Sequence, residues 1–142
     1  MRIAFVSCVK TKADRPLPAQ DLYISPWFRM AREYARQNAD RWFILSASAG
    51  LVNPHRVTDP YDLTLNGLGV KLQKDWAEMV IDQLKLHGIW GQKAIVLAGK
   101  NYRQFLMPEL IYRFGQVEVP MEGLMMGQQL SWLSRRVPLT PE

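Results

Sequence analysis

Short apolar runs that alternate with helical stretches are the feature that most constrains how this chain of 142 residues can fold. Residues 3–6, 42–46 and 94–98 have the length and composition of strands that are buried on both faces, as in a parallel sheet. Residues 117–120 predict a shorter fourth strand. Apolar side chains recur at helical spacing in the segments that follow these strands, at residues 26–37, 69–86, 102–113 and 126–136.

This β-α-β-α-β-α-β-α order predicts one α/β domain over residues 1–142. Right-handed crossovers between parallel strands place helices on both faces of a sheet. We therefore expect a three-layer α/β/α sandwich with a central, mostly parallel four-stranded sheet. Ser25 as N-cap and Pro26 at the first helical position mark the start of the first helix. Residues 51–65 contain two prolines and little periodicity, which predicts an irregular, ordered loop.

A net charge of +5 makes the chain moderately basic and favours anionic partners, such as nucleic acid or nucleotides. Arg29, Arg32 and Arg36 share one face of the first helix, which is either a surface that contacts phosphates or an ordinary solvated face. A single cysteine excludes a secreted scaffold held by internal disulfides. No apolar stretch approaches the roughly 20 residues that cross a bilayer. We expect a cytoplasmic protein with no membrane partner.

Neither a metal nor a cofactor is expected from the motifs of the chain. Two histidines and one cysteine do not make a zinc site without further ligands. The Walker, GxGxxG, HExxH and CxxC motifs are all absent.

The turns after the predicted strands carry the chain's most promising side chains, because ligands of open α/β sheets bind beyond the carboxyl ends of the strands. Small residues, hydroxyls and lysines recur there, and they suit the close approach of an anion to the backbone. The plain alternatives are solvated loop lysines, a packing cysteine and turn-capping serines. The candidates in these turns are Ser7, Cys8, Lys10, Lys12, Ser46, Gly50, Lys100 and Tyr102.

The loop at residues 55–62 contains two carboxylates, Asp59 and Asp62, which flank Tyr61 in the sequence. A carboxylate beside an aromatic ring is a common arrangement for a general base or for stabilising a sugar cation. The alternative is turn formation, because Asp59-Pro60 is a common turn opening. The ordered length of the loop favours a functional role.

Several motifs together resemble those of an uncharacterised bacterial and phage domain family, over nearly the whole chain. The motifs are Ser7-Cys8-x-Lys10-x-Lys12, Ala19-x-Asp21-Leu22-Tyr23-x-Ser25-x-x-Phe28, Trp42-Phe43-Ile44-Leu45-Ser46-Ala47-x-x-Gly50-Leu51, Pro60-Tyr61-Asp62, Gly99-x-x-Tyr102 and Gly123-x-x-x-Gly127-Gln128-Gln129-Leu130-x-Trp132-Leu133. That family is distantly similar to the uracil-DNA-glycosylase-like superfamily and to the core domain of archaeosine synthase. Cys8, Lys12, Tyr23 and Ser25 match in part the Cys-x-x-Lys-Pro-Tyr-x-x-Ser motif of the synthase. The Gly-Gln-Asp-Pro-Tyr signature of true uracil-DNA glycosylases is absent.

The resemblance implies an α/β/α sandwich and a nucleobase or nucleotide ligand, with DNA favoured over RNA. We therefore expect a nucleobase-processing enzyme, similar to a DNA glycosylase, that hydrolyses an N-glycosidic bond on a flipped base. Its expected catalytic residues are Asp59, Asp62 and Lys12. The expected substrate-binding residues are Ser7, Cys8, Lys10, Tyr23, Ser25, Ser46, Gly50, Tyr61, Lys100 and Tyr102. The alternatives are a non-catalytic nucleic-acid or nucleotide-binding accessory protein and a base-modifying transferase with a lysine nucleophile.

Overall fold

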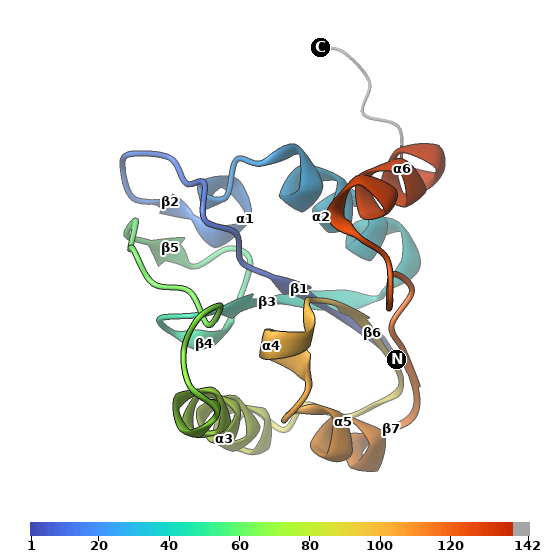
Figure 1. The fold of residues 1–142 in the computed structure, drawn as a ribbon. Helices are drawn as coiled ribbons and strands as arrows, with labels where there is room; N and C mark the ends of the chain where they lie inside the picture. The colour runs from blue at the N-terminus through green and yellow to red at the C-terminus, as the bar shows by residue number, and fades with distance from the viewer. Residues whose placement is uncertain (138–142) are drawn as a thin grey trace.

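A five-stranded sheet runs through the centre of the structure, a computed structural model that describes residues 1–137 (Figure 1). The strand order is β4-β3-β1-β6-β7. The strands are β1 (Arg2–Ser7), β3 (Arg41–Ser46), β4 (Gly50–Val52), β6 (Gly91–Leu97) and β7 (Phe114–Glu118). All neighbouring pairs are parallel except β3 and β4. The prediction of a mostly parallel sheet is confirmed.

The predicted number of four strands is wrong, because the chain turns back on itself after β3. Gly50 adopts a φ of 75°, a left-handed conformation that glycine accepts without steric cost. Residues 50–52 then pair antiparallel with the end of β3, with Ser46 opposite Gly50. A segment predicted to begin an irregular loop is therefore the fifth strand. The rest of that loop includes β5 (Val57–Thr58), which pairs with β2 (Leu17–Pro18) in a separate small sheet.

Helices flank the sheet on both sides in Figure 1, with α2 and α6 on one side and α3, α4 and α5 on the other. The helices are α1 (Ala19–Leu22), α2 (Pro26–Asn38), α3 (Val70–Leu86), α4 (Lys100–Arg103), α5 (Met107–Arg113) and α6 (Met126–Arg136). No helix among residues 1–137 is long and apolar enough to span a membrane.

The start of α2 follows from its cap, as predicted. The Ser25 hydroxyl accepts a hydrogen bond from the backbone N–H of Phe28 at 3.1 Å, and Pro26 occupies the first turn. The apolar face of α2 is buried through Trp27, Phe28, Met30, Ala31 and Ala35. This burial fixes the start of α2, and with it Trp27, above the carboxyl end of β1.

The predicted helix at residues 102–113 is two short helices, α4 and α5. Residues 104–106 form a turn between them, and Pro108 lies in the first turn of α5. A proline inside a continuous helix removes a backbone donor and clashes with the preceding turn, so the chain begins a new helix instead. The turn buries Leu106 in the core.

The strand order creates one switch point, between β1 and β6. The chain leaves β1 toward α2 on one side of the sheet and leaves β6 toward α4 on the other side (Figure 1). Connections that diverge in this way leave a crevice beyond the carboxyl ends of the two strands, where ligands of α/β proteins bind. The fold therefore points to this crevice as the place to look for a site.

Candidate functional site

A cavity of about 450 Å³ lies at the switch point between β1 and β6. Its size is within the range of small-molecule sites in proteins. Its lining comes from the turns after β1 and β6, the starts of α2 and α6, and the loop before α3. The lining residues are Ser7, Cys8, Val9, Lys10, Ser25, Pro26, Trp27, Asn66, Gly99, Tyr102, Met126, Gln129 and Leu130.

Two aromatic side chains stand in the wall of this cavity, and each is held in place. The Trp27 indole donates a hydrogen bond to Gln129 Oε1 at 2.9 Å, and the Gln129 amide donates to the Leu124 carbonyl at 2.9 Å. Tyr102 packs edge to face against Trp76, with ring centroids 5.5 Å apart. Fixed aromatic walls of this kind suit a flat, partly apolar ligand such as a heterocyclic ring.

A cluster of tyrosine hydroxyls lies beside the cavity. The hydroxyls of Tyr23 and Tyr61 are 2.7 Å apart, and the Ser46 hydroxyl donates to Tyr61 Oη at 3.1 Å. Burial raises the pKa of Tyr23 to about 12, although its hydrogen bond to Tyr61 acts in the opposite direction. Burial also raises the pKa of Tyr61, and Cys8 and Tyr23 nearby add to the effect. Both phenols are therefore neutral hydrogen-bonding groups at physiological pH.

Cys8 joins the tyrosine cluster to the cavity. Its thiol is buried, and it donates to the Tyr102 hydroxyl with a sulfur–oxygen distance of 3.4 Å. The backbone N–H of Ala47 points at the sulfur from the other side, also at 3.4 Å. Burial and Cys8 together raise the pKa of Tyr102 to about 12, and its hydroxyl also accepts the backbone N–H of Leu65 at 3.3 Å. The thiol thus has polar contacts with two different segments, the turn after β3 and the helix α4.

Lys12 lies over the tyrosine cluster, with its ammonium 4.3 Å from the Tyr61 ring centroid and 5.8 Å from that of Tyr23. The ammonium donates to the Lys10 carbonyl at 3.2 Å. Partial burial lowers the pKa of Lys12, whereas its interactions with Cys8 and with the Asp62 carboxylate oppose that lowering. A lysine of lowered pKa is a better nucleophile than an ordinary surface lysine.

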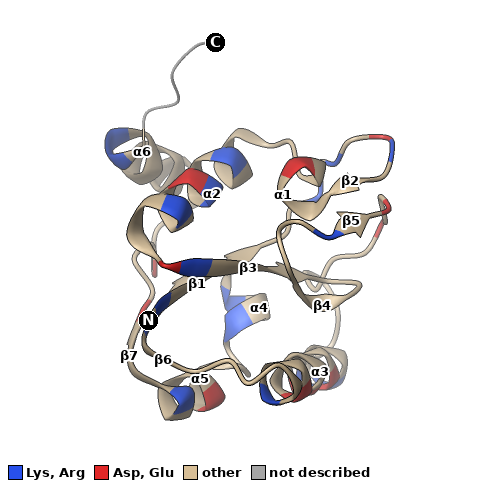
Figure 2. Ribbon diagram, turned by 180° about the vertical axis from the view of Figure 1, so that it is seen from behind, with Lys and Arg blue, Asp and Glu red and all other residues tan. Residues whose placement is uncertain are grey.

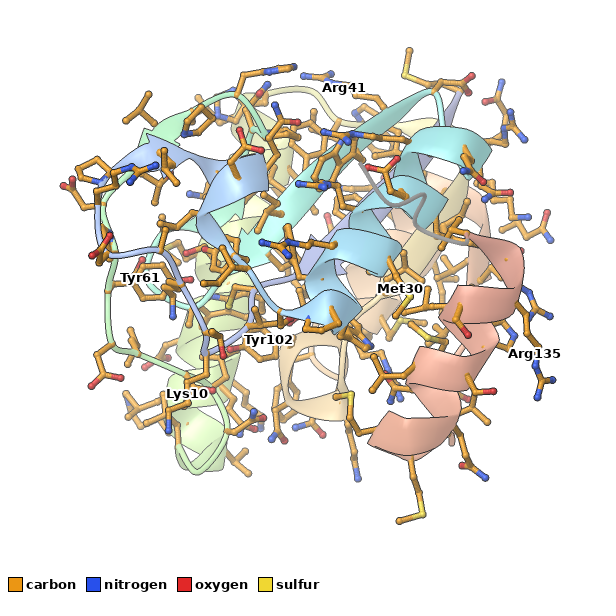
Figure 3. All side chains as sticks on the ribbon, turned by 90° about the horizontal axis from the view of Figure 1, so that it is seen from above. Lys10, Met30, Arg41, Tyr61, Tyr102 and Arg135 are labelled. Carbon is orange, nitrogen blue, oxygen red and sulfur yellow. The ribbon has the colours of Figure 1, made fainter. Side chains whose placement is uncertain are left out.

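The structure brings most of the predicted site residues together in two adjoining groups. Ser7, Cys8, Lys10, Ser25 and Tyr102 line the cavity. Tyr23, Ser46, Tyr61 and Lys12 form the cluster beside it. Figure 3 shows Lys10, Tyr61 and Tyr102 on one side of the molecule, away from Arg135.

The remaining predicted residues lie outside both groups. Asp59 and Asp62 are both exposed, and neither lines the three cavities found at this edge of the sheet. Asp62 differs from Asp59 in that its carboxylate acts on the pKa of Lys12. Lys100 lines a second cavity next to the first. Gly50 lies against Met79 and Gln83 of α3, where it makes the turn into β4.

Two of the three arginines of α2, Arg32 and Arg36, make local contacts, whereas Arg29 is exposed. Arg32 donates to the Gln20 carbonyl at 2.9 Å and lies 3.3 Å from a carboxylate oxygen of Glu33. Arg36 pairs with the same carboxylate and donates to the Gln20 side chain. Acidic and basic residues are accordingly interspersed on α2 (Figure 2). This face fits the interpretation of an ordinary solvated helix better than that of a phosphate-contacting patch.

Several lining residues were not among the predicted substrate-binding set. Trp27 was not among the predicted site residues, and Gln129 appeared only as part of the Gly123 to Leu133 motif. The hydrogen bond between them joins positions 102 residues apart, and no local pattern signals such a contact. Asn66 and Met126 complete the rim of the cavity. Among residues 1–137, no group of three or more His, Cys, Asp and Glu side chains is placed to hold a metal ion.

Comparisons with known proteins place the chain in a family. It is 29% identical over 119 residues to the uncharacterized protein YfjM of Bacillus subtilis strain 168, and the match covers 74% of each chain. No solved structure matches the chain. Residues 3–135 match DUF6884, a family of unknown function. The chain therefore belongs to the DUF6884 family.

Proposed function

We propose that this protein is a nucleobase-processing enzyme that holds a base in the cavity between β1 and β6 and hydrolyses its N-glycosidic bond. The observation that carries the proposal is the cavity itself, which lies at the switch point and has Trp27 and Tyr102 in its wall. Aromatic walls with a few polar groups suit the faces and edges of a base. The sequence resemblance to the uracil-DNA-glycosylase-like superfamily, with its three-layer α/β/α sandwich, supports the reaction class.

We assign the acidic role in this reaction to Asp62, because its carboxylate raises the pKa of Lys12 against the effect of burial. The Lys12 ammonium lies over the Tyr61 ring, and this links Asp62 to the tyrosine cluster. In the proposed step, the oxygen of a water molecule bonds to C1′ of the sugar while the bond from C1′ to the base nitrogen breaks. The water proton passes to Asp62, and the departing base keeps the electron pair and takes up a proton.

Release of free base from defined substrates tests this proposal. Oligodeoxynucleotides with varied modified bases are incubated with the protein, and released bases and abasic sites are measured by chromatography and mass spectrometry. We expect Asp62→Asn to lower the rate at least about 100-fold, as is usual for loss of a general base. Asp59→Asn is the matched control, because it removes a carboxylate from the same loop, and it should keep the rate within about twofold of wild type.

Absence of base release by the wild-type protein from every substrate contradicts the hydrolase. A protein that still binds these substrates, and binds them equally well as Asp62→Asn, is then the non-catalytic binder that the net charge of +5 also favours.

A second candidate function is a transferase in which Lys12 is the nucleophile, and the lowered pKa of Lys12 favours it. Its amine would add to a carbon of the substrate that is at the oxidation level of a carbonyl and lose water, giving a Schiff base. Sodium borohydride reduces such an adduct to a stable amine. A mass increase at Lys12 in the wild type, and its loss in Lys12→Gln, identifies this mechanism, whereas substrate turnover without any trapped adduct rejects it.

A further inference from the structure

A second cavity, of about 310 Å³, adjoins the first at the carboxyl ends of β6 and β7. The turn at residues 98–100 and the segment at residues 119–124 form most of its wall. Gly99 and Gln129 line both cavities, so the two cavities share these residues as a common wall. A ligand that occupies both cavities would pass along this wall.

The charged side chains of this second cavity are two cations and one anion: Lys100, Arg103 and Glu122. Arg103 is anchored, because its Nε donates to the Ala98 carbonyl at 3.2 Å and only 17% of its side chain is exposed. Its Nη1 lies 3.5 Å from Glu122, whose side chain is 62% exposed. An exposed partner at this distance holds an arginine weakly. An incoming anion can therefore replace Glu122 on a guanidinium that is already in position.

We propose that the second cavity binds a phosphate group of a nucleotide whose base occupies the first cavity, with Arg103 and Lys100 as its ligands. Guanidinium groups bind phosphate oxygens through paired, charge-assisted hydrogen bonds, and a neighbouring ammonium adds a point charge. The inference rests on the proposed function, because it takes the first cavity as the base site. It narrows the substrate class to phosphate esters of nucleosides, either free or within a strand.

Calorimetric titration with matched ligands tests the phosphate site separately from the base site. The ligands are the four common deoxynucleosides, their 5′-monophosphates and short single-stranded oligodeoxynucleotides. We expect at least one 5′-monophosphate to bind about tenfold more tightly than its nucleoside. Arg103→Gln should abolish this gain and leave nucleoside affinity unchanged. Arg135→Gln removes an equal charge from the far end of α6 and should keep the gain (Figure 3).

Lys100→Gln provides a second test, since Lys100 is exposed and its replacement leaves the packing of Arg103 intact. A gain that appears only with oligonucleotides and is lost in Arg103→Gln assigns the phosphate to a strand and supports the site. Equal affinity of nucleosides and all phosphorylated ligands overturns the phosphate site but does not contradict binding of a base in the first cavity. A gain in affinity from the phosphate that persists in both Arg103→Gln and Lys100→Gln also overturns the phosphate site. No binding by any ligand overturns the phosphate site, whereas the base-release assay with modified bases decides the proposed function separately.

Discussion

Replacement of Gly50 by alanine should destabilise the protein without weakening ligand binding. Gly50 has a φ of 75° and makes the turn from β3 into β4. A Cβ at this position would overlap Gln83 Oε1 and approach the Met79 Cε to 2.9 Å. The methionine methyl group can move away, but the glutamine is fixed by two hydrogen bonds to the same turn. Gln83 accepts from the Leu51 N–H at 2.7 Å and donates to the Ala49 carbonyl at 2.9 Å.

The expected loss in the free energy of unfolding combines two costs and one smaller gain. An alanine in the left-handed region costs about 1–2 kcal/mol. Displacement of Gln83 breaks two hydrogen bonds of about 1 kcal/mol each. The smaller conformational freedom of alanine in the unfolded chain returns about 0.4–1 kcal/mol. We therefore expect a net loss of about 2–3.5 kcal/mol, a large share of the roughly 5–15 kcal/mol that stabilises a domain.

Urea denaturation measures this loss, and Gly88→Ala is its matched control. Gly88 has a φ of 60°, but a Cβ there would meet no atom within 4 Å. Only the backbone cost less the gain from the unfolded chain then applies, a net loss of about 1 kcal/mol. In a Gln83→Ala background, the cost of Gly50→Ala should fall to the same value. Equal losses for Gly50→Ala and Gly88→Ala in the wild-type background would refute the role assigned to Gln83.

Asp62→Asn should lower the pKa of Lys12 further, because the carboxylate opposes the effect of burial, whereas Asp59→Asn should leave that pKa unchanged; NMR titration of the lysine side chain measures both. The free energy of unfolding should fall as the pH rises from about 10 to 12. The Tyr23 phenol has a pKa of about 12 in the folded protein and 10.0 ordinarily, so the unfolded chain loses this proton first. Tyr23→Phe should make this fall shallower in urea titrations over the same pH range. Ser25→Ala should cost about 1 kcal/mol in the same assay at neutral pH, through loss of the α2 cap.

Elements with strong local signals were predictable from the sequence. The apolar run at residues 3–6 lies inside β1, and the Ser25-Pro26 pair marks the start of α2. The break between α4 and α5 also had a signal, because Pro108 does not fit a helix interior. The fifth strand had only the small-residue turn before it. Its three residues become a strand through pairing with β3, a contact that periodicity does not reveal.

The site was predictable to the extent that the sheet positions it. Residues that directly follow β1, such as Cys8 and Lys10, reach the cavity because carboxyl ends of parallel strands lie at one edge of a sheet. The contribution of α6 was not predictable, since the contact between Gln129 and Trp27 depends on how β7 pairs with β6, which no local pattern signals. The prediction of Asp59 and Asp62 as site residues rests on local composition, which does not determine the path of their loop.

The order of that loop has a structural cause that is separate from catalysis. Hydrogen bonds hold the loop at two places. The Tyr61 hydroxyl is hydrogen-bonded to Tyr23 and Ser46, and the Leu65 N–H donates to the Tyr102 hydroxyl. An ordered loop of this length therefore needs no substrate to explain it, and order alone does not mark Asp59 and Asp62 as functional. The two carboxylates differ in their position relative to these hydrogen bonds. Asp62 lies between Tyr61 and Leu65 in the chain, whereas Asp59 lies before Tyr61. The proposed assignment of Asp62 rather than Asp59 therefore depends on where the hydroxyls of Tyr61 and Tyr102 hold the chain.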